Sequence, residues 1–382
     1  MGCSEDLSMP PENMPEIRAR ARQLGLKFGT LPTGVQNAIT DVPGVLVGHV
    51  TLHSGEGKLV PGEGPVRTGV TAILPHPGNV FADKVEGAVH VINGFGKSAG
   101  LLQVEELGQI ESPILLTNTL SVGAALEGAI RYSIMQSPEI GITTGTVNCV
   151  VGECNDGYLN DIQGMHVRPE HAIEAIKAAK SELPAEGAVG AGTGMVCYGF
   201  KGGIGTASRL VSHPALPTPY ILGALVLSNF GKREHLTQCG VPVGRLLAAA
   251  DAPASSGDGS AMIILATDAP FDSRQLGRLA RRGAFGLARS GAIASHGSGD
   301  FVVAFSTTRR HSHDNRDIHV ERPGLSEAGT LLNEMFQAVA EALDEAVANS
   351  LFMAVDTTGR DYNTAAALPL RQVLNLLRTV IT

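Results

Sequence analysis

The sequence is short of aromatic residues, of positive charge and of long apolar runs. It contains no tryptophan, and aromatic residues make up 4% of its 382 positions. No stretch approaches the ~18 uninterrupted apolar residues of a membrane-spanning helix, so we expect no membrane partner. Lys and Arg number 29 against 37 Asp and Glu, which gives a net charge of −8 without any large basic run, and this balance argues against nucleic acid as a partner.

Cysteine and metal-binding patterns are equally sparse. The five cysteines are an odd number without the spacing of a disulfide framework, and Cys149 and Cys154 are too far apart for a C-x-x-C motif. The N-terminus lacks the apolar segment of a secretory signal, so we predict a cytoplasmic protein with reduced thiols. His311, His313 and His319 lie in a charged stretch without ligand-like spacing, which predicts a solvated loop over 308–324, no metal and no other cofactor.

The most informative stretch is the junction at Ser260. Small polar residues run from Ser255 to Gly259, and the apolar run 261–266 that follows predicts a buried strand. One hydroxyl therefore lies where a loop enters the core, which is where a self-cleaving amidohydrolase would have its nucleophile. Cleavage of the Gly259–Ser260 bond would free an α-amine with a pKa of roughly 7.7–8.0 beside that hydroxyl, and such an amine can activate a nucleophile. The alternative, from these residues alone, is a strand that begins with Ser after a surface loop.

A second serine, Ser98, offers two competing interpretations. After a predicted strand over 87–92, the pattern G-x-G-x-x-A at 94–99 is similar to a dinucleotide fingerprint, and G-x-S-x-G at 96–100 is similar to a nucleophile elbow. The first would make this a non-catalytic nucleotide-binding protein, but no clear strand ending in an acid follows at a distance of ~20 residues. The second would make it a conventional Ser-His-acid esterase, but no later Asp and His pair is singled out by its surroundings. We therefore prefer a Gly-rich helix entry that lines a pocket.

Polar residues also flank three other predicted strands. The buried strand 146–152 is followed by Glu153 and the run CNDGYLND, which predicts either an Asx-rich turn or the polar wall of a pocket. Asn229 comes after the strand 221–227, where it is either a cap or an amide donor to an oxyanion. Ser298-Gly299-Asp300 comes directly before the strand 301–305.

The remaining pattern predicts strands in meanders and hairpins with a few helices between or after them. Further strands are expected over 68–74 and 114–119, around the Pro43-Gly44 turn, and in a hairpin of 194–200 with 204–210 that turns at 201–203. Helices are expected over 120–136, 169–183, 273–290, 325–355 and 369–380. With 47 glycines and 43% apolar residues, the chain can build a large core with closely packed backbone. We predict an α+β fold with two packed sheets, as one domain over 1–382.

Taken together, these stretches resemble the family of L-aminopeptidase/D-esterases and β-peptidyl aminopeptidases, the DmpA-like serine hydrolases. The resemblance covers nearly the whole chain, from about residue 20 to residue 380. The segments that carry it are NAITDV at 37–42, GVTAILPH at 69–76, NGFG at 93–96, the Gly-rich stretch 192–209, GVPVG at 240–244, GS at 259–260 with ATD at 266–268, and SGD at 298–300 with AFST at 304–307. Each segment alone is modest, and seven in order along one chain are specific.

The resemblance implies a four-layer α/β/β/α sandwich, similar to that of N-terminal nucleophile hydrolases but differently connected, and a homo-oligomer. It implies a self-processing precursor that is cut into 1–259 and 260–382, and expected substrates are small peptides, amino acid amides or esters. The implied site has the nucleophile Ser260, further catalytic positions at Ser298 and Asp300, an oxyanion-stabilising amide at Asn229, and an acid for the substrate amine at Glu153. One position departs from the pattern: a better-known member has Tyr as an oxyanion donor two residues after that Glu, where this chain has Asn155.

The expected reaction is acyl transfer. Ser260 Oγ attacks the substrate carbonyl, its own α-amine or a relay through Ser298 and Asp300 accepts the proton, and water resolves the acyl-enzyme. We expect Gly259 to adopt backbone angles closed to other residues, so that its carbonyl can turn toward the hydroxyl during self-cleavage. Acyltransferases of the ornithine acetyltransferase kind have a similar fold but use Thr as nucleophile, so Ser260 counts against that activity.

Overall fold

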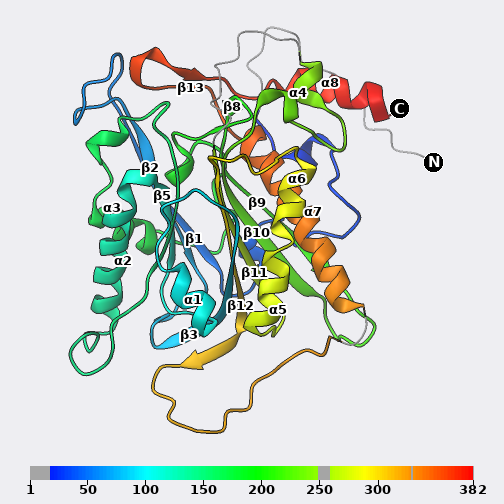
Figure 1. Ribbon diagram of the computed structural model, residues 1–382. Coiled ribbons are helices and arrows are strands. Elements are labelled where there is room, and N and C mark those ends of the chain that lie inside the picture. The colour runs from blue at the N-terminus through cyan, green and yellow to red at the C-terminus, as the bar shows by residue number, and fades with distance from the viewer. Residues whose placement is uncertain (1–17, 248–258, 328–329, 382) are drawn as a thin grey trace.

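A computed structural model describes residues 18–247, 259–327 and 330–381. Two large β-sheets lie face to face, and helices cover the outer face of each sheet (Figure 1). The polar stretch 255–258 that precedes Gly259, and the start of the N-terminal arm, lie outside the described residues. Within the described ranges, no helix is both long and apolar enough to cross a membrane.

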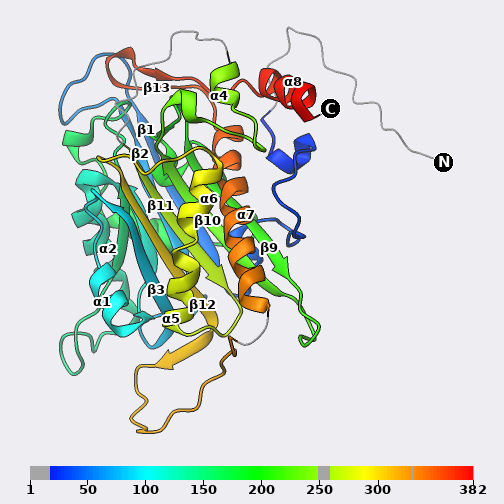
Figure 2. The ribbon, with the colours of Figure 1, turned by 45° about the vertical axis from the view of Figure 1, so that its right-hand side comes forward.

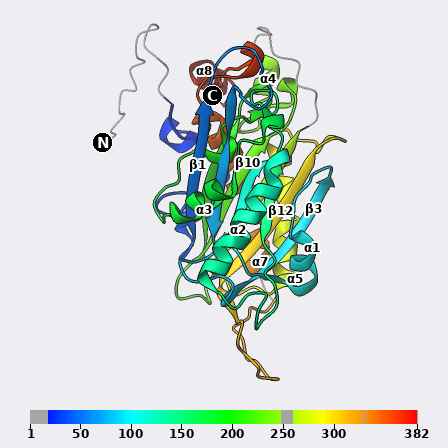
Figure 3. The ribbon, with the colours of Figure 1, turned by 90° about the vertical axis from the view of Figure 1, so that its left-hand side faces the viewer.

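The smaller sheet has four strands in the order β1–β2–β5–β6, with β5 and β6 parallel and the other neighbours antiparallel. These strands are β1 (Leu46–Ser54), β2 (Val66–Leu74), β5 (Ile114–Asn118) and β6 (Val150–Cys154). Helices α2 (Val122–Gln136) and α3 (Pro169–Lys177) pack on its outer face (Figure 3).

The larger sheet has six strands in the order β4–β3–β12–β11–β10–β9, so β11 is an interior strand. The strands are β3 (Asp83–Gly94), β4 (Gln109–Ile110), β9 (Gly203–Val211), β10 (Tyr220–Asn229), β11 (Ser260–Thr267) and β12 (Gly299–Ser312). Its outer face is covered by α5 (Ser273–Ala280), α6 (Gly283–Arg289) and α7 (Leu331–Phe352), as Figure 2 shows. Shorter elements complete the fold: α1 (Leu101–Leu107), α4 (Val243–Leu246), α8 (Leu370–Ile381), and the two-stranded pairs β7 (Val196–Cys197) with β8 (Phe200–Lys201) and β13 (Thr357–Thr358) with β14 (Thr364–Ala365).

Three clusters of buried apolar side chains hold the four layers together. The central cluster joins the two sheets, with Ile73 and Leu116 from the smaller sheet against Leu225, Ile264 and Val303 from the larger one. A second cluster lies between the smaller sheet and α2 and α3, and a third lies between the larger sheet and α5 to α7. Strands with apolar neighbours on both faces must be apolar throughout, which is why their sequences read as continuous apolar runs. The predicted α+β sandwich of helix, sheet, sheet and helix layers is confirmed.

Glycine permits close approach between these layers. A Cβ at Gly205 of β9 would collide with the carbonyl of Ala346 in α7, and one at Gly48 of β1 would collide with the carbonyl of Ala175 in α3. The high glycine content thus lets helix backbones approach the sheets directly at these positions.

Most predicted strands and helices are present, but the hairpin predicted over 194–210 is wrong. The turn lies instead at Tyr198 and Gly199, both of which have positive φ, and it joins the short strands β7 and β8. Positive φ at both central residues is the geometry of a tight two-residue hairpin turn. Lys201, predicted to lie in that turn, is fully buried in β8, and β9 pairs with β10 rather than with β7.

Other boundaries also differ from prediction: α3 ends at Lys177 instead of residue 183, and β6 covers Val150–Cys154 instead of 146–152. The predicted helix 273–290 is divided into α5 and α6 at Arg281 and Arg282. The segment before Pro43 forms a short 3-10 helix, Ile39–Asp41, instead of a strand. Strand β12 continues to Ser312, so His311 lies in the sheet and is not in a solvated loop: it is 7% exposed, and its Nε2 lies 2.7 Å from Glu86 Oε2.

Candidate active site

Ser260 is the first residue of β11, and two neighbouring strands bring other polar residues to it. The antiparallel register with β10 places Asn229 opposite Ser260, and the parallel register with β12 places Gly299 on its other side. Asn229 Nδ2 lies 3.4 Å from Ser260 Oγ, and Ser260 is 4% exposed. Sheet pairing therefore gathers three segments that are distant in the sequence at one end of the larger sheet.

The side-chain amide of Asn229 is held in one orientation. Its Oδ1 accepts a hydrogen bond from Val196 N–H at 2.9 Å, and its Nδ2 donates to the backbone carbonyl of Asn155 at 3.0 Å. Because the oxygen already faces an N–H donor, the NH₂ group is the end that faces Ser260. An N–H so placed can stabilise the negative charge that develops on a carbonyl oxygen when Ser260 Oγ attacks the carbonyl carbon.

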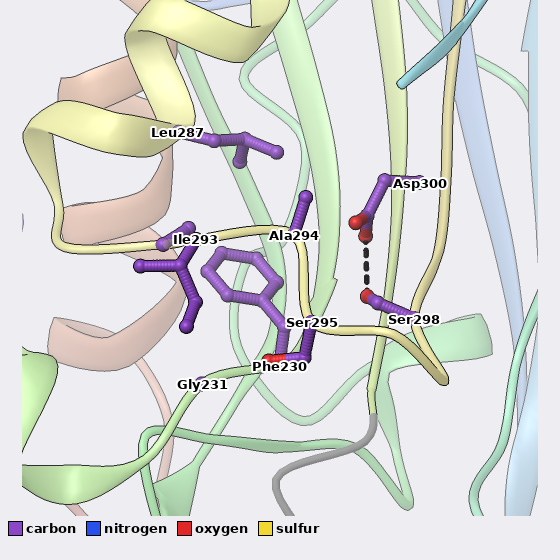
Figure 4. Close-up of a pocket in the computed structure, with 9 residues that line it drawn as sticks. Phe230, Gly231, Leu287, Ile293, Ala294, Ser295, Ser298 and Asp300 are labelled. Atoms are coloured by element: carbon purple, nitrogen blue, oxygen red, sulfur yellow. Dashed lines mark hydrogen bonds between the residues drawn. The ribbon is translucent and has the colours of Figure 1, made fainter. Parts of the chain in front are cut away.

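Ser298 and Asp300 form a second polar pair at the start of β12 (Figure 4). Ser298 Oγ donates to Asp300 Oδ1 at 2.8 Å, and Ala261 N–H also donates to the Asp300 carboxylate. Asn93 Nδ2, at the end of β3, donates to the Ser298 carbonyl at 2.5 Å and fixes the turn. Burial raises the pKa of Asp300 to about 6, against the opposing effect of these two donors.

The Ser298–Asp300 pair is connected to Ser260 through a backbone N–H group, not through a direct side-chain contact. Between the described residues, no direct hydrogen bond joins Ser260 to either of them, and the link is the N–H of Ala261, next to Ser260. Beside the pair lies a small pocket of about 10 Å³, roughly the space of one water molecule. Its lining is Phe230, Gly231, Leu287, Ala292, Ile293, Ala294, Ser295, Ser298 and Asp300.

Glu153 approaches from the smaller sheet. It lies inside β6, one position before the strand ends, and not after the strand as predicted, and it is 3% exposed. Lys97 N–H donates to its Oε1 at 2.9 Å, and the Thr119 hydroxyl donates to its Oε2. None of the salt bridges found in the described ranges involves Glu153. A buried carboxylate with only neutral donors can pair with a cationic group of a ligand.

Cys154, the next residue, connects Glu153 with Ser260. Its thiol makes a side-chain hydrogen bond with Ser260 and lies 3.7 Å from the Leu227 carbonyl oxygen. Burial raises the pKa of this thiol well above its ordinary value, so it is a neutral neighbour of the hydroxyl. Sequence reasoning considered Cys154 only for metal or disulfide motifs and missed this contact. Its position beside Glu153 in a buried strand was the available signal.

Asn155 takes part through its backbone. Its side chain is exposed, and its Oδ1 accepts from Gly157 N–H at 2.9 Å in an Asx turn. Only its carbonyl oxygen reaches the site, where it accepts from Asn229 Nδ2. The predicted oxyanion or substrate-binding role of the Asn155 side chain is not supported by this orientation.

Gly259 is required for a different reason from the one predicted. Its φ is not in the left-handed region. A Cβ there would instead collide with the Asn229 carbonyl oxygen and lie 2.6 Å from Phe230 Cα. The Gly259 carbonyl oxygen accepts from Gly299 N–H at 3.1 Å. Glycine at this position thus allows β10 to lie close to the start of β11.

The interpretations built on Ser98 fail on geometry. Its hydroxyl donates to the thioether of Met262 at 3.7 Å, and no histidine of the described chain forms a hydrogen bond with it. The preceding strand β3 pairs antiparallel with both of its neighbours, so the parallel strand–helix–strand unit of a dinucleotide site is not formed here. The Gly-rich segment instead borders the candidate site, because Lys97 N–H donates to Glu153. Over the described ranges, no group of three or more His, Cys, Asp or Glu side chains could hold a metal ion.

Comparisons with known proteins identify the family of the chain. Residues 37–365 match the model of peptidase family S58. The chain belongs to peptidase family S58. It is 42% identical over 378 residues to the β-peptidyl aminopeptidase BapA of Sphingosinicella microcystinivorans, an alignment that covers 94% of this chain and 92% of BapA. It is therefore an aminopeptidase, a hydrolase of peptide bonds.

Solved structures show the same fold. The PH0078 protein from Pyrococcus horikoshii OT3 superposes with a TM-score of 0.90 at 51% identity, covering 95% of this chain and 99% of that one. The L-aminopeptidase D-Ala-esterase/amidase from Ochrobactrum anthropi superposes with a TM-score of 0.88 at 36% identity, covering 94% and 98%. The latter is described as a prototype for the serine aminopeptidases and as a variant of the Ntn hydrolase fold. The aminopeptidase described here shares that fold, which confirms the family resemblance drawn from its motifs.

Proposed function

We propose that this aminopeptidase is self-processing and uses Ser260 as the nucleophile of both self-cleavage and peptide hydrolysis. The observation that carries the proposal is the junction itself: a buried hydroxyl begins an interior strand, and the Asn229 amide lies 3.4 Å from it. The bond to be cut, Gly259–Ser260, joins that strand to a segment outside the described residues.

Self-cleavage proceeds in two steps that balance. Ser260 Oγ attacks the Gly259 carbonyl carbon and the C–N bond breaks, so an ester replaces the peptide bond and the nitrogen, with the hydroxyl proton, becomes the amine of Ser260. Water then hydrolyses the ester and leaves a carboxyl group on Gly259 and a free hydroxyl on Ser260. The freed amine is the base for later turnovers.

Peptide hydrolysis repeats the same chemistry on a substrate. Glu153 pairs with the ammonium of the substrate, Ser260 Oγ attacks the adjoining carbonyl, and the Ser260 amine takes the proton and passes it to the leaving amine. Asn229 Nδ2 stabilises the oxyanion, a contribution of roughly 3–4 kcal/mol for one such donor. Ser298 and Asp300 hold the start of β11 through Ala261 N–H and supply an ionisable group beside it. Water resolves the acyl-enzyme, and the substrates are small peptides, amino acid amides or esters.

The mass of the purified protein under denaturing conditions tests the proposal. We expect two fragments, 1–259 and 260–382, from the wild type and one uncut chain from Ser260→Ala. Ser98→Ala is the matched control, because it removes a hydroxyl from the other serine motif and should leave cleavage intact. A wild-type protein that stays one chain and is fully active would rule the proposal out. A panel of aminoacyl amides with L-, D- and β-amino termini would identify the preferred substrate.

We also propose a cytoplasmic homo-oligomer. Cys149, Cys154, Cys197 and Cys239 are free thiols, which suits a reducing compartment. The homo-oligomer rests on the family resemblance, and the native mass would test it.

A further inference from the structure

Lys201 is a buried lysine that the proposed reaction does not use. It is the last residue of β8 and is 0% exposed. Its Nζ donates three hydrogen bonds of 2.8 Å, to the backbone carbonyls of Gly192, Met195 and Gly202. An ammonium group has three N–H donors, so these carbonyls satisfy all of them. The side chain thus ties together both ends of the loop that contains β7 and β8.

This loop delivers the hydrogen bond that orients Asn229. Val196 is paired directly with Lys201 across the β7–β8 hairpin, and Val196 N–H donates to Asn229 Oδ1 at 2.9 Å. The carbonyl of Met195, which Lys201 holds, belongs to the same peptide group as that N–H. A shift of this peptide would therefore move the donor that fixes the Asn229 amide.

The other bond of Asn229 also leads to a buried ionisable group. Its Nδ2 donates to the carbonyl of Asn155, and the next residue, Asp156, is fully buried. Asp156 Oδ1 accepts from Asn160 Nδ2 at 3.0 Å, while its Oδ2 is buried without a hydrogen-bond partner. Asp156 interacts electrostatically with Lys201 and favours the charged lysine, whereas burial lowers the pKa of Lys201 to about 7.

We propose that Lys201 is a positioning residue that, through the β7–β8 hairpin, fixes the Asn229 amide toward Ser260. The inference rests on the proposed role of Asn229 as the oxyanion donor. Burying an ammonium group costs desolvation free energy, and the three backbone carbonyls that accept its hydrogen bonds offset that cost here. Lys201 is paired with Val196, whose N–H orients Asn229. This position gives the lysine a role in the site in addition to its role in packing.

The test is a double-mutant cycle between Lys201→Met and Asn229→Ala, with kcat and KM measured on an aminoacyl 4-nitroanilide. Lys201→Met keeps an unbranched side chain and removes all three donors. Because misplacing a catalytic group by about 1 Å can cost ~10²-fold, we expect kcat to fall about 10- to 100-fold with KM within about twofold. In the Asn229→Ala background the same change should have no further effect, since Lys201 acts through that residue. The rate of self-cleavage should follow the same pattern.

Lys84→Met is the matched control. Lys84 is also a buried lysine that donates to a backbone carbonyl, that of Phe81, and it pairs with Glu111 away from Ser260. Its loss should lower the thermal stability and leave kcat of the folded enzyme unchanged.

Each outcome decides the inference. Wild-type kcat in Lys201→Met, or an equal loss of kcat with and without Asn229, would overturn it. Where Lys201→Met does not fold, Lys201→Gln is measured instead. Where neither folds, Val196→Pro, which keeps the lysine and removes the N–H that donates to Asn229 Oδ1, must reproduce the loss of kcat. Full activity of Asn229→Ala and Ser260→Ala would instead refute the proposed function on which the inference rests.

Discussion

Glu153 and Asp300 are both buried carboxylates near Ser260, yet their surroundings suit them to different tasks. Glu153 accepts hydrogen bonds from Lys97 N–H and the Thr119 hydroxyl, and its charge has no cationic partner in the described part of the chain. Asp300 accepts from Ser298 and from Ala261 N–H, and burial raises its pKa to about 6. The first arrangement suits an anchor for a substrate ammonium, and the second suits a group whose ionisation changes near neutral pH.

Replacing Glu153 by Gln should abolish the preference of the enzyme for a substrate with a free amine over its N-acetylated form. The amide keeps the shape but removes the charge that pairs with the substrate ammonium. We expect kcat/KM for an aminoacyl amide to fall roughly 10²–10³-fold, the size typical of removing one partner of a buried charge pair. Activity on the N-acetylated amide should change little, and self-cleavage should persist because it uses no substrate amine. The measurement is kcat/KM for both substrates on both proteins.

Glu111→Gln is the control for this change. Glu111 is a buried carboxylate that pairs with Lys84 instead of being free for a ligand, so its replacement should leave the preference intact. A Glu153→Gln enzyme that still prefers the free amine would show that the ammonium is bound elsewhere, and Asp156 would become the candidate.

The substitution Asp300→Asn should raise the stability of the protein and lower its activity. Burial raises the pKa of this carboxyl from 3.8 to about 6, so the folded state favours its protonated form. The resulting stability is fully present below pH ~4 and is lost as the pH rises through about 6. Asp300→Asn should therefore have a higher Tm than wild type at pH 8, corresponding to ~3 kcal/mol in the free energy of unfolding, and the difference should vanish near pH 4. Turnover should fall ~10²–10⁴-fold if the carboxylate aids proton transfer.

Asp344→Asn separates the two effects. Asp344 lies in α7, pairs with Arg289, and burial raises its pKa to about 6 as well, but it is outside the site. This variant should retain turnover. If wild-type kcat/KM does not decline as the pH falls below about 6, or if Asp300→Asn is fully active, Asp300 has no part in the reaction.

At the scale of elements, the sequence predicts apolar strands well. It predicts poorly those strand segments that contain a charged or ionisable residue. The apolar run after Ser260 predicted β11 because an interior strand of a sandwich is buried on both faces. Lys201 and His311 interrupt the apolar pattern, so the sequence predicts a turn at the first and a loop at the second. In the structure, backbone carbonyls satisfy the first and Glu86 the second, partners that are distant or invisible in the sequence. The site residues at strand ends could be found from their position, and so could Cys154 beside Glu153, whereas Lys201 could not.

The close packing of β10 against the start of β11 predicts that Gly259→Ala will impair self-cleavage. The added methyl would meet the Asn229 carbonyl oxygen and Phe230 Cα, so the two strands must separate where Asn229 faces Ser260. We expect the uncut chain to accumulate and cleavage to slow at least about tenfold, because the oxyanion donor moves with β10. The fraction of cut chain over time is the measurement. Gly123→Ala, whose Cβ would meet nothing within 4 Å in helix α2, should cleave as wild type does. Equally fast cleavage of both variants would show that the contact is not critical.

At the scale of the molecule, the pattern of strands and helices predicts two packed sheets. The family resemblance predicts the full four-layer sandwich. The order of strands was not predictable, because register and pairing depend on contacts between distant segments. This order determines how the two fragments of the proposed cleavage would be held together. Fragment 260–382 contributes β11 and β12, which lie between β3 and β10 of fragment 1–259, and α7 packs against β9.

The two fragments should therefore remain one folded unit after cleavage. Every residue of β11 is buried, and its ladder to β10 extends over eight residue pairs, from Leu222 with Thr267 to Asn229 with Ser260. Separating the fragments would expose the apolar surface on both faces of these strands, at about 25 cal/mol for each Å². We expect the cleaved enzyme to elute as a single species that contains both fragments, and to release them only in denaturant concentrations that also abolish its folded circular dichroism signal. Ser260→Ala, as an uncut chain, should elute at the same volume. Release of either fragment under native conditions would mean that the sheet is not continuous across the cut.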